Sequence, residues 1–155
     1  MTRSLHVEER KVGDPELDAL VAAAVLELNR RYRDPGEPWE DYPIHGDVVF
    51  HLATVDGEPA GCIARVDVDE PDWTRTVEMK RVFVQERFRG RGVARALVGT
   101  FEEAARQAGA ARVRLETGTR QPEAMALYEA LGYARTTNFG PWADSPLSVC
   151  YAKDL

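Results

Sequence analysis

The residues between 80 and 95 constrain the fold of this chain more than any other stretch. The run Val82-Phe83-Val84 is apolar on both faces, as the end of a buried central strand should be. The sequence then passes through Gly90 and Gly92 into a helical stripe of apolar residues that Gly109 ends. Glycines let the backbone turn tightly, and the start of a helix exposes N–H groups with a partial positive charge. This segment therefore predicts an anion-binding turn between a strand and a helix.

The charge distribution favours one specific anion over a general polyanion. The chain has a formal net charge of −6. Residues 80–95 hold six cations and one anion, so their local charge is +5 and the rest of the chain carries −11. An acidic protein is a poor general binder of nucleic acid or of anionic membranes. We therefore expect a small anionic ligand as the partner, and neither nucleic acid nor a membrane.

Hydrophobic periodicity predicts a mixed sheet with helices on its faces. The spacing favours helices over residues 14–32, 92–108 and 122–131, and strands over residues 5–11, 48–55, 59–68, 75–84, 113–117, 133–138 and 147–153. Asp56-Gly57 is a strong hairpin turn between two of these strands. Because the first strands form a hairpin, the order fits the α+β class and not a doubly wound parallel sheet. At 155 residues, a single domain over residues 1–155 is expected.

The composition excludes several other classes of protein. The longest uncharged apolar run, residues 19–26, is far shorter than the about 20 residues that a membrane span needs. Residues 1–11 contain no apolar core of a secretion signal, which favours a cytoplasmic location. The two cysteines, Cys62 and Cys150, are too few for a disulfide scaffold and have no neighbours with metal-ligand spacing. We expect two buried thiols and no metal site.

Three kinds of phosphate-binding turn compete for residues 87–95. A P-loop requires Lys followed by Ser or Thr, and nothing here supplies that pair. A dinucleotide-binding turn requires Gly or Ala at the sixth position of G-x-G-x-x-G, but that position is Arg95. What remains is R-x-x-G-x-G, at residues 87–92, between a strand and a helix. A second motif, A-x-x-L-Y-x-x-L-G-Y, follows at residues 124–133.

With these two motifs the chain resembles the GNAT superfamily of acetyl-CoA-dependent N-acetyltransferases, over roughly residues 46–140. The resemblance implies an α+β GNAT fold with a mixed, mostly antiparallel sheet of about six to seven strands and helices on both faces. It implies that the fourth and fifth strands splay apart at a bulge. Acetyl-CoA is the implied co-substrate, and a homodimer is compatible with the resemblance.

The resemblance also implies which residues bind acetyl-CoA. Backbone N–H groups between Arg89 and Ala94 are expected to hold the pyrophosphate, and Val82 and Val84 to hydrogen-bond the pantetheine as an added strand would. A backbone N–H near Val82 is expected to face the thioester oxygen as an oxyanion donor. Gln121 stands where relatives carry an asparagine, and it keeps the amide chemistry for a pantetheine contact. The implied set is Val82, Phe83, Val84, Arg87, Arg89, Gly90, Arg91, Gly92, Val93, Ala94 and Gln121.

Acyl transfer to an amine requires a base for the nitrogen's proton and an acid for the leaving thiolate. Tyr128 matches the family tyrosine that points at the CoA sulfur, so it is the expected acid. Two carboxylates compete for the base. Glu78 lies on the fourth strand, where several GNAT enzymes carry theirs, and Glu116 ends the fifth strand, where the ribosomal-protein alanine acetyltransferases carry theirs. We favour Glu78 as the base. The alternative to a glutamate base is a water chain, or an amine that is deprotonated before it binds. Either glutamate could also be an ordinary sheet carboxylate paired with Arg75 or Arg114.

The acceptor amine is the least constrained part of the hypothesis. The loop over residues 34–46 offers Trp39, Tyr42 and His45 among carboxylates, which suits an aromatic or polycationic amine but also an ordinary solvated loop. Phe139 and Trp142 lie in an F-G-x-W turn that resembles small bacterial GNAT proteins. We expect these two aromatics either to wall the acceptor pocket or to cap the core.

The predicted function is transfer of an acetyl group from acetyl-CoA to a primary amine, in a small molecule or at a peptide N-terminus. Direct attack in a ternary complex is expected, because neither cysteine lies in a motif that would make it an acyl carrier. The alternative is a non-catalytic acyl-CoA sensor or interaction module. The presence of Tyr128 and of two candidate bases argues against that alternative.

Overall fold

The computed structural model describes residues 4–31, 44 and 46–155. Its helices and strands follow the expected order, with ends that differ from the expected ones by a few residues at most. They are β1 (Leu5–Arg10), α1 (Pro15–Arg31), β2 (Val48–Val55), β3 (Glu58–Asp67), β4 (Thr76–Val84), α2 (Val93–Gln107), β5 (Arg112–Gly118), α3 (Pro122–Ala130), β6 (Ala134–Thr136) and β7 (Ser148–Asp154). Short 3₁₀ turns occur at η1 (Pro71–Trp73), η2 (Glu86–Phe88) and η3 (Gly140–Trp142).

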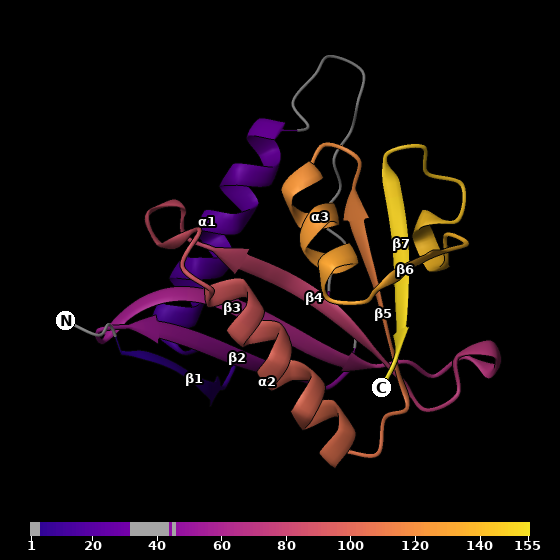
Figure 1. Ribbon diagram of the computed structural model, residues 1–155, viewed down its shortest axis with the longest axis horizontal. Helices are drawn as coiled ribbons and strands as arrows, with labels where there is room; N and C mark the ends of the chain where they lie inside the picture. The colour runs from indigo at the N-terminus through magenta and orange to yellow at the C-terminus, as the bar shows by residue number, and fades with distance from the viewer. Residues whose placement is uncertain (1–3, 32–43, 45) are drawn as a thin grey trace.

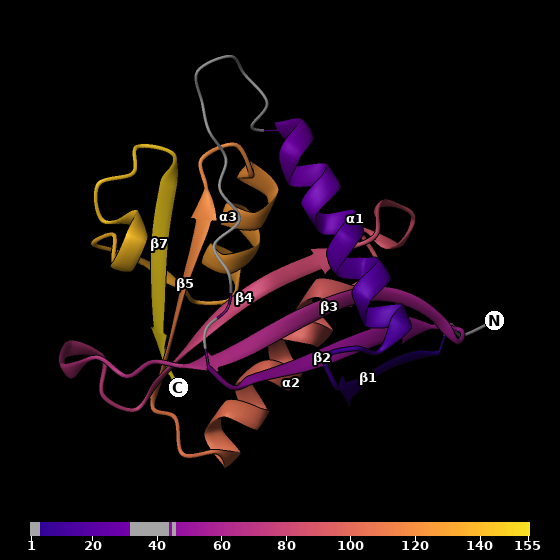
Figure 2. The ribbon, with the colours of Figure 1, turned by 180° about the vertical axis from the view of Figure 1, so that it is seen from behind.

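The strands form one mixed sheet of seven, in the order β1-β2-β3-β4-β5-β7-β6. Only β4 and β5 pair in parallel, and the other neighbours are antiparallel. One face of the sheet carries α2 and α3, and the opposite face carries α1 (Figures 1 and 2). The expected α+β fold, with helices on both faces, is confirmed. None of the helices in the described segments is long and apolar enough to cross a bilayer.

The two parallel strands part where the resemblance implies. Their pairing ends with Met79 opposite Leu115, after which β4 and β5 diverge (Figure 1). The register of β4 against β3 shifts by one residue just beyond this point, and Arg81 has a positive φ of 55°. A bulge of this kind bends and twists its strand. The expected splay and bulge are confirmed, and we call the widening gap beyond Met79 and Leu115 the fork.

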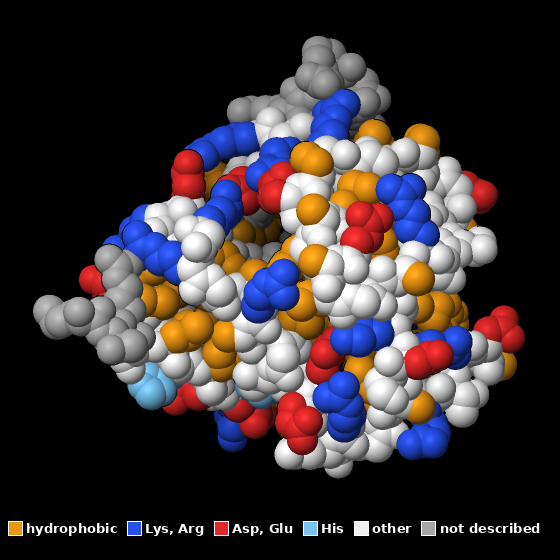
Figure 3. Space-filling view, in the orientation of Figure 1, with side chains coloured by type: hydrophobic (Ala, Val, Ile, Leu, Met, Phe, Trp, Pro, Cys, Tyr) orange, Lys and Arg blue, Asp and Glu red, His pale blue; other side chains and the backbone are white. Residues whose placement is uncertain are grey.

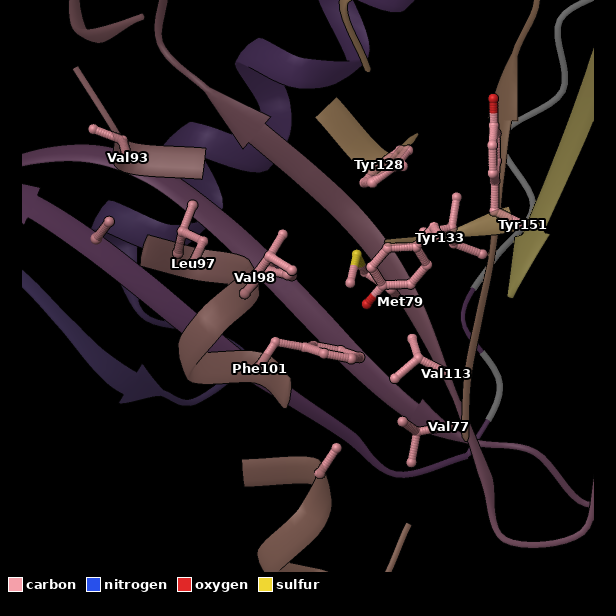
Figure 4. Close-up of a cluster of buried hydrophobic side chains, with 14 of the residues drawn as sticks. Val77, Met79, Val93, Leu97, Val98, Phe101, Val113, Tyr128, Tyr133 and Tyr151 are labelled. Carbon is pink, nitrogen blue, oxygen red and sulfur yellow. The ribbon is translucent and has the colours of Figure 1, made fainter. Parts of the chain in front are cut away.

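Two hydrophobic layers hold the sheet between its helices. Figure 4 shows the layer under α2 and α3, which includes Val77, Met79, Leu97, Val98, Phe101, Val113, Tyr128, Tyr133 and Tyr151. The layer under α1 contains Leu17, Leu20, Phe50, Leu52, Cys62 and Ala64. Burying each Leu or Phe side chain contributes about 1.5–3 kcal/mol. These layers fix the start of α2 and the position of α3 on either side of the fork.

Candidate active site

The turn between β4 and α2 is open to an anion. Gly90 and Gly92 have φ values of +75° and +82°, which glycine adopts without strain. A Cβ at either position would meet no atom within 4 Å, so backbone conformation, not crowding, requires glycine there. No side chain caps Gly92, and the first helical bond runs from Ala96 N–H to Gly92 O. The N–H groups that open α2 therefore lack helical partners, as an anion cradle requires.

The arginines of this turn differ in what they touch. Arg89 donates from Nε to the carbonyl of Val84 at 2.9 Å and from its terminal nitrogen to both oxygens of Glu27 on α1, at 2.7 and 2.9 Å. Arg87 pairs with Glu58 at 2.8 Å in an exposed contact. Arg91 is exposed, with its guanidinium 5.9 Å from the ring centre of Phe88. Arg89 thus ties the turn to β4 and α1, and direct contact of the three arginines with a ligand stays a prediction.

The end of β4 presents a free backbone edge to the fork. Gln85 N–H bonds to Ala60 O on β3 at 2.8 Å, so by alternation the polar groups of Val82 and Val84 point away from β3. Within the segments that the structure describes, no strand pairs with β4 on this side beyond Met79. The Val84 carbonyl accepts a hydrogen bond from Arg89. The Val84 N–H and the N–H and carbonyl of Val82 are therefore left to bond a ligand. The ring of Phe83 packs into the layer under α1.

A hollow opens at the fork on the face that carries α2 and α3. Figure 3 shows it between the end of β4 and α3, with hydrophobic side chains in its depth and lysine or arginine side chains around its rim. Apolar depth with charged groups at the entrance suits a ligand with a chain-like apolar part and an anionic end.

Tyr128 lies beside the fork on α3. It is only 6% exposed, and its ring contacts those of Tyr133 and Tyr151 at centroid distances of 6.0 and 6.1 Å. Its hydroxyl has no hydrogen-bond partner in the described part of the chain. Burial, and then the negative charge of Glu116, raise the pKa of Tyr128 above its ordinary value. The hydroxyl therefore stays protonated and can donate a hydrogen bond into the fork.

Glu78 is buried within an ion-pair network. Its Oε1 accepts from Arg114 Nε at 2.7 Å, and its Oε2 lies 2.8 Å from Lys80 Nζ. Arg114 also holds both oxygens of Glu70, each at 3.0 Å. The structure thus shows Glu78 paired with Arg114. This pairing was the expected arrangement if Glu78 were an ordinary sheet carboxylate and not the catalytic base. Both carboxylate oxygens of Glu78 are therefore already in contact with cations.

Glu116 has the opposite environment. It is the first residue of β5 beyond the fork's last paired position, and no described residue forms an ion pair with it. Burial raises its pKa from 4.5 to about 7, the charge of Lys80 lowers it, and that of Glu78 raises it. A carboxylate with a pKa near neutrality is suited to general base catalysis. The geometry therefore favours Glu116 over Glu78 as the base.

The remaining candidates divide into buried, capping and undescribed residues. Burial raises the pKa of Cys62 to about 12 and that of Cys150 to about 11, so neither forms a thiolate at neutral pH. Gln121 precedes the first turn of α3, and its N–H bonds to Gly118 O at 3.1 Å. Trp39, Tyr42 and His45 lie outside the described residues. Among the described ones, no three His, Cys, Asp or Glu side chains are grouped to hold a metal ion.

An aromatic cluster covers the ion-pair network. Several residues of the cluster and of the network were not predicted from the sequence. Phe139 packs edge-on against Trp73 and Trp142, at 5.4 and 5.9 Å between ring centres. Arg114 lies 4.0 Å from the Phe139 ring centre, and Lys80 lies 4.7 Å from that of Trp142. Phe139, Trp142 and Glu78 were candidates, but Trp73, Lys80 and Glu70 were not. The available signal was charge at alternate positions of β4 and β5, where burial would otherwise select apolar residues.

The forked sheet and the glycine turn define an acyltransferase-type fold. Comparison of the chain with known protein families and structures leads to the same class. The model of the acetyltransferase (GNAT) family matches residues 19–133, so the chain belongs to this family. It is 38% identical over 109 residues to the IAA acetyltransferase of Azospirillum brasilense, covering 70% of this chain and 69% of that protein. It is 35% identical over 97 residues to human N-acetyltransferase 8, covering 61% of this chain but only 43% of the human protein.

Solved structures share the fold over nearly the whole chain. A Klebsiella pneumoniae protein named as an acyl-CoA N-acyltransferase superposes with a TM-score of 0.77 at 31% identity, covering 97% of each chain. A GNAT acetyltransferase from Elizabethkingia anophelis, solved with acetyl-CoA bound, superposes with a TM-score of 0.71 at 18% identity, covering 97% of this chain and 98% of that one. At that lower identity the likeness concerns the fold alone.

Proposed function

We propose that this protein transfers an acetyl group from acetyl-CoA to a primary amine by direct attack in a ternary complex. The observation that carries the proposal is the placement of Tyr128 and Glu116 at the fork, each without a polar partner in the described chain. Tyr128 belongs to the layer under α2 and α3, whereas Glu116 alternates with the buried Leu115 and so projects from the opposite face. A thioester in the fork would be reached by the two groups from opposite faces.

The backbone of this chain fits the non-reacting parts of acetyl-CoA. The N–H groups of the turn at residues 89–94 would hold the pyrophosphate. The free edge at Val82 and Val84 would bond the pantetheine as an added strand does. The Val82 N–H would then face the thioester oxygen, where negative charge develops as the amine attacks. That a relative of the same fold is solved with acetyl-CoA bound supports this assignment.

The proton transfers follow from the two side chains. As the amine nitrogen attacks the thioester carbon, the new C–N bond forms, the C–S bond breaks, and the nitrogen loses a proton to Glu116. The departing sulfur takes a hydrogen bond, or a proton, from the Tyr128 hydroxyl. Cys62 and Cys150 take no part, because their raised pKa values keep both as thiols.

A matched pair of variants tests the assignment of the base. Glu116→Gln should lower kcat by about 100-fold or more, the range for loss of a general base, with acetyl-CoA affinity unchanged. In the wild type, kcat/KM should rise as pH increases through about 7, because the base acts only when ionised, and this rise should vanish in Glu116→Gln. Activity that survives Glu116→Gln but is lost in Glu78→Gln would assign the base to Glu78. Acetyl-CoA binding with no thiol release in the presence of any amine would instead indicate a non-catalytic module.

A further inference from the structure

One cation, Lys80, and one carboxylate, Glu116, lie on the same face of the sheet where β4 and β5 begin to diverge. We call this place the mouth of the fork. Lys80 and Glu116 are each the first residue beyond the last paired position, Met79 opposite Leu115. Side chains alternate along a strand, so Lys80 shares a face with Glu78, and Glu116 shares a face with Arg114. The Glu78–Arg114 bond of 2.7 Å shows that these two faces are one. Lys80 and Glu116 form no ion pair with each other, although the charge of Lys80 lowers the pKa of Glu116.

Arg114, the neighbouring cation, is already committed. Its three guanidinium nitrogens donate to Glu78 and to the two oxygens of Glu70. Its flat face lies 4.0 Å from the ring centre of Phe139 and 5.1 Å from that of Trp73. Arg114 is therefore held on the sheet and serves as an anchor for Glu78.

Lys80, in contrast, is held in place with donors to spare. Glu78 fixes its Nζ at 2.8 Å, and the ring of Trp142 lies 4.7 Å away. An ammonium group has three N–H donors, and among the described residues Glu78 is the one carboxylate within ion-pair distance of it. The side chain is 21% exposed, so solvent reaches it. Lys80 is thus a preorganised cation at the mouth of the fork with hydrogen-bonding capacity left.

An acceptor that covers the fork would remove water from this ammonium group. Losing hydration without a replacement hydrogen bond is costly for a charged group. A polycationic acceptor would also bring like charge against Lys80, whereas a carboxylate would supply a charge-assisted hydrogen bond. Ionised Glu116, on the other strand, suits an ammonium group in the same way. The two charges are therefore complementary to a molecule that carries both an amine and a carboxylate.

We infer that the acceptor is a free amino acid, whose amine lies at Glu116 and whose carboxylate is bound by Lys80. This inference rests on the proposed N-acetyl transfer and names the substrate class for the same site. It makes Lys80 a specificity-determining residue for the acceptor. The aromatic ring of Trp142, next to Lys80, would then border the amino-acid side chain.

The first test compares each of the twenty protein amino acids with its own amide, with thiol release from acetyl-CoA as the readout. The amide keeps the amine and the side chain and removes only the carboxylate charge. At least one amino acid should be acetylated with a kcat/KM about tenfold or more above that of its amide, the usual effect of one lost charge-assisted contact. Thiol release with the amides alone, or equally with both, would overturn the inference and leave the proposed function standing. If no amino acid and no amide supports thiol release although acetyl-CoA binds, the inference is overturned. The proposed function is overturned as well only if other primary amines, such as polyamines and peptide N-termini, also give no thiol release.

The second test uses Lys80→Met, with Lys80→Arg as the matched control, on the best amino acid and its amide at pH 8.5. At this pH Glu116 is ionised, so a change in its protonation does not confuse the comparison. Lys80→Met should raise KM for the amino acid about tenfold or more with a smaller effect on kcat, leave KM for the amide unchanged, and preserve acetyl-CoA affinity. Lys80→Arg should retain most of the discrimination. An equal loss for the amino acid and its amide would give Lys80 a structural role and overturn the inference.

Discussion

Glu78 and Glu116 lie on neighbouring strands and on one face of the sheet, yet their surroundings separate their roles. The carboxylate of Glu78 is neutralised by Arg114 and Lys80, which makes it part of the scaffold. Glu116 is partly buried without such a partner, so desolvation destabilises its charged form. A group whose ionisation costs the folded state free energy is a candidate for chemistry and does not stabilise the fold.

The free energy of unfolding should report this cost directly. Glu116 has a pKa of about 7 in the fold against an ordinary value of 4.5, so as pH rises from 4 to 8 its ionisation favours the unfolded chain. Glu116→Gln removes this penalty. The variant should match the wild type at pH 4 and exceed it by about 3 kcal/mol at pH 8, measured by urea unfolding. Glu78→Gln, which leaves Arg114 and Lys80 short of a charge, should instead be less stable than the wild type at pH 8. Equal stability of Glu116→Gln and the wild type at pH 8 would contradict this account of Glu116.

Removing one hydroxyl tests the role of Tyr128. Tyr128→Phe should lower turnover by about tenfold or more, because the leaving thiolate loses its proton or hydrogen-bond donor, while acetyl-CoA affinity stays nearly unchanged. Tyr151→Phe is the matched control, since it lies in the same aromatic layer but its hydroxyl bonds to Glu129 at 3.2 Å, away from the fork. Unchanged turnover in Tyr128→Phe would remove Tyr128 as the acid.

We expect the turn between β4 and α2 to bind the pyrophosphate through backbone N–H groups, whose placement depends on the shape of the backbone. At Gly92 the φ of +82° is strained for any residue with a Cβ, by about 1–2 kcal/mol, so Gly92→Ala should distort the N–H cradle. We expect acetyl-CoA to bind about tenfold more weakly, as measured by calorimetry. Gly99→Ala is the control, because Gly99 lies inside α2 with open space around it, where alanine stabilises a helix by about 1 kcal/mol. If the two variants bind acetyl-CoA equally well, the turn is not the cradle.

The elements could be predicted from the sequence because their signals are local. The apolar stripe of α2 and its end at Gly109 lie within one stretch of chain, and so does the hairpin turn at Asp56-Gly57. The fork, by contrast, was implied only by the family resemblance. The pairing of Glu78 with Arg114 was one named alternative, beside Arg75. The network with Lys80 and Glu70 could not be predicted, because it depends on the register that sets Glu78 opposite Arg114, 36 residues away. The positive φ of Arg81 was equally hidden, since arginine carries no signal for that conformation.

Across the whole molecule, α1 joins the two sides of the fork from behind the sheet. Near its end, Glu27 accepts two hydrogen bonds from Arg89 in the turn between β4 and α2. At its last residue, Arg31 donates to the carbonyl of Arg120, and Arg120 donates to the carbonyl of Arg31, each at 3.1 Å. Arg31 also pairs with Glu123 of α3. One helix thus contacts both the turn between β4 and α2 and the loop before α3.

We propose that acetyl-CoA binds in the fork and that its acetyl group is transferred there to an amine. The most direct measurement is a calorimetric titration with acetyl-CoA, and separately with ATP, followed by addition of amines to the acetyl-CoA-loaded protein with thiol release recorded. We expect acetyl-CoA to bind with a Kd on the order of micromolar, ATP not to bind, and thiol release to match amide formation one for one. Absence of acetyl-CoA binding would contradict the assignment of the turn, of the β4 edge and of the catalytic pair together.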